Sequence, residues 1–202
     1  LKQVEPSEHP LACLARLYEK SNGKDTMTGH WEMMGIETKK PFITFTEYGF
    51  PPELIKELEA RTGHKVIGNK SASGTEILDE LGEEEIATGH MIVYTSADSV
   101  FQIAMNVDKF GLDTLYHYCE VARKMLVGDW ACGRVIARPY IINAEGKRER
   151  TSDRKDYSVT PPGDTILDMI KNAGKMVYAI GKIHDIFAGR GMTEFTYTSG
   201  NT

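Results

Sequence analysis

The sequence predicts an α/β fold, because segments with strand patterns alternate along the chain with segments of helical periodicity. Residues 91–95 form a continuous apolar run, which is typical of a strand covered on both faces of its sheet. Residues 112–126 carry apolar side chains at helical spacing. We therefore expect a small α/β domain of about four strands with helices, flanked on either side by further α/β segments.

Two helices and a strand are predicted within residues 1–74. Apolar positions within residues 10–20 have helical spacing. A second helix is expected to begin near Pro52, since proline is favoured in a first turn, and to end at residues 61–63. Residues 65–68 predict a short strand, followed by a loop over residues 69–74.

Two further elements are predicted, a helix with a capping box and a strand that ends near a proline. Ser73 and Glu76 have the spacing of a capping box, which predicts a helix through Leu81. Residues 134–137 predict a strand that stops near Pro139, because proline has no N–H to donate to a sheet.

The last third of the chain begins with a polar stretch. Residues 143–154 predict a loop, residues 165–173 a helix and residues 176–181 a buried strand. The strongest break is Pro161-Pro162-Gly163, and a weaker one lies near residues 39–41. The predicted division is a segment of residues 1–41, a domain of residues 42–160 and a segment of residues 161–202.

Composition narrows the possible functions. The chain has 202 residues and a net charge of -5, and its Lys and Arg form no continuous block, which argues against nucleic-acid binding. No apolar run approaches the roughly 18 residues of a membrane helix, and no signal peptide is visible. Three scattered cysteines without a CxxC pair favour a reduced, cytoplasmic protein. Leu1 is no initiator residue, and the end carries no structural stop signal, so we expect a fragment.

Residues 23–32, GKDTMTGHWE, are the most unusual stretch of the sequence. They combine a cation, a carboxylate, two hydroxyls and an imidazole with two glycines, which allow close approach of a ligand to the backbone. A threonine hydroxyl is a weak nucleophile unless a base or a metal ion lowers its pKa. Two interpretations stay open: a functional loop, or the start of a helix with Asp25 or Thr28 as its N-cap.

Other segments suit an anion less specifically. Residues 68–75 precede a predicted helix, whose free N–H groups can bind an anion, although an ordinary capped helix explains them equally well. Polar residues 95–99 follow a buried strand, a position that often lines a ligand crevice. Four arginines flank the following strand and loop, where they can bind phosphate or face solvent: Arg134, Arg138, Arg150 and Arg154.

Taken in order, several motifs of the chain resemble those of phosphopentomutases. They are KDTMTGHWE, GNKSASGTEILDELG, VYTSADSVFQIA, GRVIARP, RTSDRKDY and AIGKIHDIF, and together they extend from about Gly23 to Glu194. The resemblance implies an internal piece of a protein of the alkaline-phosphatase-like superfamily, in which a cap domain is flanked by remnants of a metal-binding α/β core. Lys155 stands where the family usually has histidine, which puts only that loop in doubt.

The resemblance also implies roles for individual residues. Thr26 matches the threonine that is phosphorylated and that meets the metal ions. Arg150 matches a phosphate-binding arginine, and Lys182 a substrate-contacting lysine. The remaining matches line the sugar-phosphate pocket: Ser96, Asp98, Val100, Arg134 and Ile136.

The implied reaction interconverts ribose 1-phosphate and ribose 5-phosphate, and the deoxyribose equivalents, through a phosphothreonine and a bisphosphate intermediate. Two manganese ions and a sugar bisphosphate activator are implied for the whole protein, with pentose phosphates as its small-molecule partners. The family's segments rich in metal-binding Asp and His are not found, so we expect the chain to need the remainder of its core and to be inactive alone. The alternatives are a non-catalytic sugar-phosphate-binding cap and a related phosphohydrolase.

Overall fold

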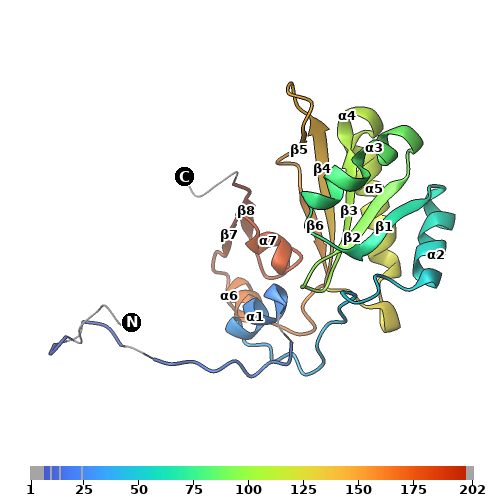
Figure 1. The fold of residues 1–202 in the computed structure, drawn as a ribbon. Coiled ribbons are helices and arrows are strands. Elements are labelled where there is room, and N and C mark those ends of the chain that lie inside the picture. Colours follow the sequence, from blue (N-terminus) through green and yellow to red (C-terminus); the bar gives the residue numbers. More distant parts are fainter. Residues whose placement is uncertain (1–6, 10, 14, 24, 199–202) are drawn as a thin grey trace.

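A computed structural model describes residues 7–9, 11–13, 15–23 and 25–198 of the chain. Its fold is mixed α/β, which confirms the predicted class (Figure 1). The strands form one six-stranded sheet and one two-stranded sheet. The larger sheet therefore has more strands than the four or so that the sequence predicts.

The helices and strands have the following bounds. The helices are α1 (Thr26–Met33), α2 (Pro52–Thr62), α3 (Glu76–Thr88), α4 (Val107–Phe110), α5 (Leu112–Met125), the 3-10 helix η1 (Gly128–Trp130), α6 (Ile166–Asn172) and α7 (Ile183–Ile186). The strands are β1 (Val66–Ser71), β2 (Met91–Thr95), β3 (Val100–Asn106), β4 (Arg134–Ile142), β5 (Arg148–Arg150), β6 (Lys155–Ser158), β7 (Tyr178–Ile180) and β8 (Glu194–Thr196).

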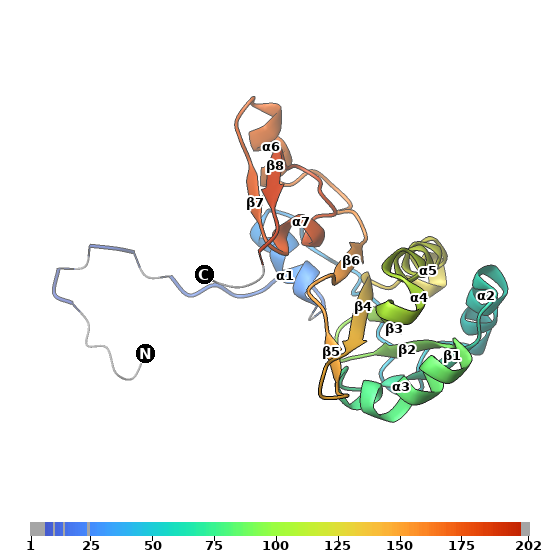
Figure 2. The same cartoon turned by 90° about the horizontal axis from the view of Figure 1, so that it is seen from above.

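The six-stranded sheet has the order β1-β2-β3-β4-β5, and β6 also pairs with β4. Parallel pairs join β1 to β2 and β3 to β4, whereas β2 and β3 are antiparallel, as are β4 and its two partners. Helices α2 and α5 cover one face of this sheet and α3 covers part of the other (Figure 2). Strand β2 is buried throughout, as its apolar run predicts.

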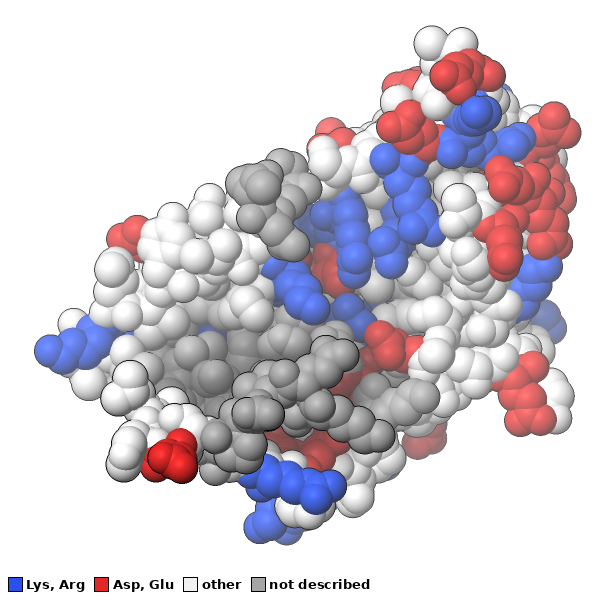
Figure 3. Space-filling model, turned by 60° about the vertical axis from the view of Figure 1, so that its left-hand side comes forward, with Lys and Arg blue, Asp and Glu red and all other residues white. Residues whose placement is uncertain are grey.

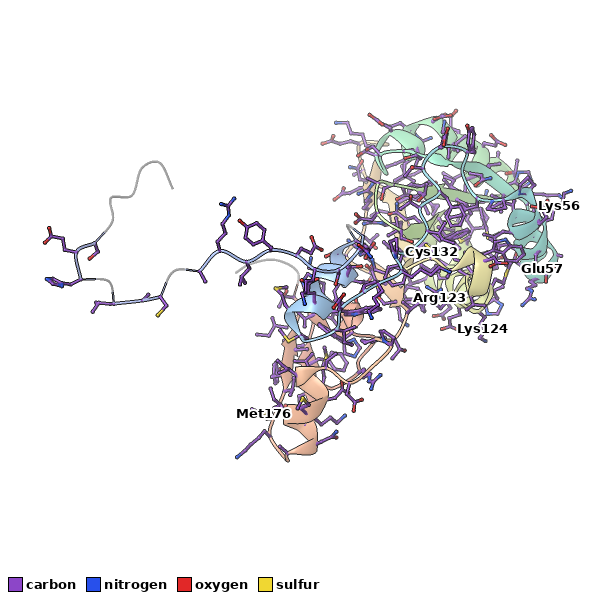
Figure 4. All side chains as sticks on the ribbon, turned by 90° about the horizontal axis from the view of Figure 1, so that it is seen from below. Lys56, Glu57, Arg123, Lys124, Cys132 and Met176 are labelled. Atoms are coloured by element: carbon purple, nitrogen blue, oxygen red, sulfur yellow. The ribbon has the colours of Figure 1, made fainter. Side chains whose placement is uncertain are left out.

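Arg123 fixes the end of α5 against the start of β4. Its guanidinium donates to the carbonyl oxygens of Cys132 at 2.9 Å and Tyr157 at 3.5 Å, and it also contacts the Leu126 carbonyl at 2.5 Å (Figure 4). Three carbonyls thus share one half-buried cation. This contact helps to fix the amino end of β4, where the candidate site begins.

A second apolar cluster joins α1 to the C-terminal elements. It contains Met27 and Trp31 of α1 together with Ile186 and Phe187 around α7. The Trp31 indole N–H donates to the Ile186 carbonyl at 3.1 Å. Helix α1, which precedes the six-stranded sheet in the sequence, and α7, which follows it, therefore share one apolar core. The predicted domain boundaries stay a prediction.

Several predicted elements are confirmed, and their ends have identifiable causes. Helix α2 has Pro52 in its first turn and ends at Gly63, whose left-handed φ of 74° suits glycine. Helix α6 begins with a capping box formed by Thr165 and Asp168. The predicted strands are present within residues 65–68 and 91–95, and the predicted helix is present within residues 112–126.

Other predictions are wrong. Described residues 11–13 and 15–20 form no helix. The Ser73–Glu76 capping box does not form, because Thr75 takes the N-cap position and makes no side-chain capping bond. Strand β4 does not stop at Pro139 but continues to Ile142.

Several strands in the second half of the chain also differ from the predicted ones. Pro139 lies between the part of β4 paired with β6 and the part paired with β5, so its missing N–H interrupts neither pairing. Residues 143–154 contain β5 rather than loop alone. Strand β7 is mostly exposed instead of buried, and β3 was not predicted. None of the described helices combines the length and the apolar character needed to cross a bilayer.

Candidate functional site

Thr26 is the first residue of α1, so the stretch that contains it is a helix start rather than an extended loop. Asp25 is its N-cap, and the Asp25 carboxylate accepts the Met27 N–H at 2.8 Å. The Thr26 hydroxyl is half-buried, whereas Thr28 is fully buried. Of the two hydroxyls, Thr26 is therefore the one that a ligand can reach.

His30 lies one helical turn after Thr26 and contacts it. Its Nδ1 is 2.6 Å from the Thr26 carbonyl oxygen and 3.4 Å from the Thr26 hydroxyl. A protonated Nδ1 would donate to the carbonyl, so the ring holds the first turn of α1 beside the hydroxyl.

Asp25 connects this helix to the sheet. Its second carboxylate oxygen accepts the Ser99 N–H at 3.2 Å and lies 3.9 Å from Arg134 Nη2. Ser99 precedes β3 and Arg134 begins β4, and these two strands pair in parallel. The helix start with Thr26 is thus fixed beside the amino ends of two central strands.

Arg134 is surrounded by carboxylates. Besides Asp25, its guanidinium lies 3.3 Å from Asp98 and 3.2 Å from Asp156, and its side chain is only 7% exposed. Asp156 also accepts hydrogen bonds from Arg154 at 2.7 and 2.8 Å. The charge of Arg134 is therefore already balanced by carboxylates of the protein. Arg134 links separate segments of the chain, and it is also a candidate substrate-binding residue.

Polar residues gather on one face of the sheet at this point. Alternation along β4 puts Arg134, Ile136 and Arg138 on the same face. The register sets Gln102 of β3 and Asp156 of β6 opposite Ile136. The Arg138 Nε–H donates to Gln102 at 3.0 Å.

The remaining predicted site residues lie around this face. Ser96 and Asp98 are half-buried in the turn between β2 and β3, and Val100 is buried at the start of β3. Arg150 is exposed at the end of β5, where it pairs with Tyr140. Lys182 is exposed immediately before α7.

A cavity of about 440 Å³ lies where the β6 region meets the C-terminal elements. It is lined by Arg154, Lys155 and Asp156 on one side and by Lys182 and Asp185 on the other. Figure 3 shows Lys and Arg side chains side by side at the centre of the face it presents, with acidic side chains among them. The cavity has the mixed charge expected of a site for a polar anionic ligand.

The structure does not bring all predicted site residues into one cavity. Thr26 lines a separate recess of about 670 Å³ with Tyr18, His30 and Met33. The structure joins Thr26 to Asp98 and Arg134 through Asp25, whereas Lys182 belongs to the cavity with Arg154.

Sequence reasoning missed several residues of this region. Gln102, Asp156 and Tyr94 were not singled out, although each lies on or beside the polar sheet face. One signal was available: Arg134 and Arg138 recur at even spacing in an apolar strand, and a strand puts such residues on one face.

The implied manganese ions need several oxygen or nitrogen ligands that converge on one point. Among the described residues, no group of three or more His, Cys, Asp and Glu side chains is arranged to hold a metal ion. The Asp25 oxygens are engaged by the Met27 and Ser99 N–H groups. The described residues therefore do not by themselves fit the implied two-ion site.

The sequence is similar to several known proteins over nearly all its residues. A phosphopentomutase of Agathobacter rectalis is 61% identical over 193 residues, which cover 95% of this chain and 49% of the relative. A phosphopentomutase of Clostridium perfringens is 58% identical over 195 residues, 96% of this chain and 49% of the relative.

A third phosphopentomutase, from Caldanaerobacter subterraneus, is 56% identical over 201 residues, covering 100% of this chain and 51% of the relative. No protein-family model matches the sequence. The chain spans about half the length of the curated relatives it matches. This chain is therefore homologous, over nearly all of its residues, to about half of a phosphopentomutase.

Proposed function

We propose that this chain is part of an isomerase that interconverts ribose 1-phosphate and ribose 5-phosphate, and the corresponding deoxyribose phosphates. Thr26 is the proposed phosphate carrier, and a sugar bisphosphate is the proposed intermediate. One observation supports this most: Asp25, next to Thr26, contacts both the Ser99 N–H and Arg134 of the candidate sugar-phosphate region.

The position of Thr26 suits a phosphorylated residue. The first N–H groups of a helix have no partners within the helix, and the helix dipole places partial positive charge there. A phosphate on Thr26 would lie at this end of α1, where its negative charge is stabilised. Asp25 and His30 would hold the first turn in place during transfer.

Two cations, Arg150 at the end of β5 and Lys182 before α7, are proposed to hold the phosphate that does not react. Arg150 and Lys182 have no carboxylate within ion-pair distance among the described residues, so both can bind a ligand oxygen. Binding energy at the remote phosphate positions the reacting end of the sugar. Ser96, Asp98, Val100 and Ile136 would line the sugar pocket beside them.

The proposed cofactors and location belong to the protein at the full length of its relatives. Two manganese ions would supply Lewis-acid chemistry at the Thr26 oxygen, and a sugar bisphosphate would activate the enzyme. Of the residues described here, only Thr26 is proposed as a ligand. A cytoplasmic location is supported by the cysteines, since Cys13, Cys119 and Cys132 are all free thiols.

Turnover at the full length of the relatives tests this function. Thr26→Ala should abolish conversion of ribose 1-phosphate to ribose 5-phosphate, and Thr28→Val, which keeps the buried shape, should retain it. Release of free phosphate in place of the isomer would identify a phosphohydrolase, and sugar-phosphate binding without any turnover would identify a binding module. Full activity of Thr26→Ala would refute the proposed role of Thr26.

A further inference from the structure

We propose that Arg138 and Arg150 together form a phosphate-binding site beside the Tyr94 hydroxyl, and that this site takes the monoester phosphate of the sugar. This inference rests on the function proposed above, and it adds Arg138 and Tyr94 to the residues that serve it. Each of the three residues lies on a different strand: β2, β4 and β5.

Arg138 is held in place with its guanidinium edge available. Its Nε–H donates to Gln102 at 3.0 Å, which fixes the plane of the guanidinium on the polar face of β4. The side chain is half-buried, and no described carboxylate lies within ion-pair distance of it. The two Nη groups are therefore fixed donors without an anionic partner.

Arg150 and Tyr94 meet at Gly74. A Cβ added to Gly74 would collide with Arg150 Nη2 and lie 2.6 Å from the Tyr94 hydroxyl oxygen. Glycine therefore leaves the space in which these two polar groups approach the backbone. Tyr94 is 1% exposed, so its hydroxyl has a defined position beneath the exposed Arg150.

The charges of this region are not balanced. Burial lowers the pKa of Arg138, and the nearby Arg154 and Arg150 charges lower it further. Burial raises the pKa of Tyr94, against the influence of the same three arginines. Asp156 pairs with Arg154, but Arg138 and Arg150 have no such described partner. Repulsion between these cations favours an anion that touches both.

The donors suit a phosphate monoester. Arginine pairs with phosphate through two parallel N–H groups, and two arginines can engage different oxygens of one phosphate. The neutral Tyr94 hydroxyl can donate to a further oxygen. The overall charge of -5 argues against a polyanion such as nucleic acid, which needs a large block of clustered Lys and Arg.

Calorimetric titration of the 202-residue chain with ribose 5-phosphate tests the site. Arg138→Gln and Arg150→Gln should each weaken binding about tenfold or more, as expected for loss of a charge-assisted hydrogen bond. Arg61→Gln is the matched control, because Arg61 lies on α2, across the sheet, in an exposed pair with Glu57. It should bind like the parent, and ribose without phosphate should not bind measurably.

Two outcomes would overturn the inference. If Arg138→Gln binds ribose 5-phosphate like the parent while Arg150→Gln is weakened, Arg138 has no part in the site, and the proposed isomerase function is unaffected. If the parent binds neither ribose 5-phosphate nor inorganic phosphate, the site does not exist, and the Thr26 variants still decide the function separately.

A second variant covers a failure to fold. Circular dichroism and thermal unfolding identify whether Arg138→Gln is native. If it is not, Arg138→Lys is measured, since it keeps the positive charge but loses the planar pair of N–H groups. Weakened binding by Arg138→Lys supports the site, and parent-like affinity overturns it.

Discussion

Arg134 Nη2 lies 3.9 Å from the Asp25 carboxylate, and this contact joins the helix that begins at Thr26 to the first residue of β4. Asp25 is the N-cap of α1, and Arg134 also contacts Asp98 and Asp156. A single buried cation therefore holds together the candidate phosphate carrier, the turn before β3 and the strand β6. The position of Thr26 depends on it.

Removal of Arg134 should destabilise the chain. Asp25 and Asp156 have side chains only 5% and 9% exposed, so Arg134→Ala leaves two buried carboxylates short of a cation. The free energy of unfolding should fall by on the order of 3 kcal/mol, measured by urea denaturation. Arg61→Ala breaks an exposed ion pair and should change it by less than about 1 kcal/mol. Equal midpoints for Arg134→Ala and the parent would contradict this role.

A methyl group at Gly74 should disturb phosphate binding. Gly74→Ala puts a Cβ against Arg150 Nη2 and the Tyr94 hydroxyl, and the buried Tyr94 cannot easily move. Ribose 5-phosphate affinity should fall about tenfold, the effect of losing one charged hydrogen bond. Gly163→Ala, which meets nothing within 4 Å, is the control and should bind normally. Unchanged affinity of Gly74→Ala would show that Arg150 does not act from this position.

Glu85 should make stability depend on pH. It is fully buried, and burial raises its pKa, although hydrogen bonds from Tyr140 and the Asn106 N–H and the charges of Lys109 and Arg148 oppose the rise. Because the folded-state pKa exceeds the unfolded one, the folded chain binds this proton more tightly. The contribution of this group to stability is therefore present at low pH and is lost as the pH rises through the folded-state pKa.

Glu85→Gln removes that titration. Urea denaturation at a series of pH values rising from the ordinary glutamate pKa of 4.5 should give a smaller decline in stability with rising pH for Glu85→Gln than for the parent. The comparison uses the slope, so any constant cost of the substitution cancels. Identical slopes would mean that Glu85 does not titrate differently in the folded chain.

The sequence could predict the elements whose signals are local. Pro52 and Gly63 set the ends of α2, and the apolar run of β2 indicates burial on both faces. The described residues 11–13 and 15–20 form no helix, because their apolar side chains lack a packing partner: Leu17 is 90% exposed and Tyr18 75% exposed. Helical periodicity without a packing partner does not make a stable helix.

Elements decided by tertiary contacts could not be predicted in the same way. Strand β3 contains Gln102 and ends at Asn106, polar residues that interrupt an apolar pattern but are buried because other elements supply their partners. The motifs pointed to Thr26 and Arg134 individually. The motifs could not predict that Asp25 connects Thr26 to Arg134, since the contact between Asp25 and Arg134 depends on the packing of α1 beside the sheet.

Phosphate mapping on the protein at the full length of its relatives tests the central claim most directly. The enzyme is incubated with a sugar bisphosphate, trapped in acid, digested and analysed by mass spectrometry. The phosphate should be on Thr26, the half-buried hydroxyl at the start of α1, and Thr26→Ala should carry none. Phosphate on Thr28, which is fully buried here, or on any residue other than Thr26 would contradict the account.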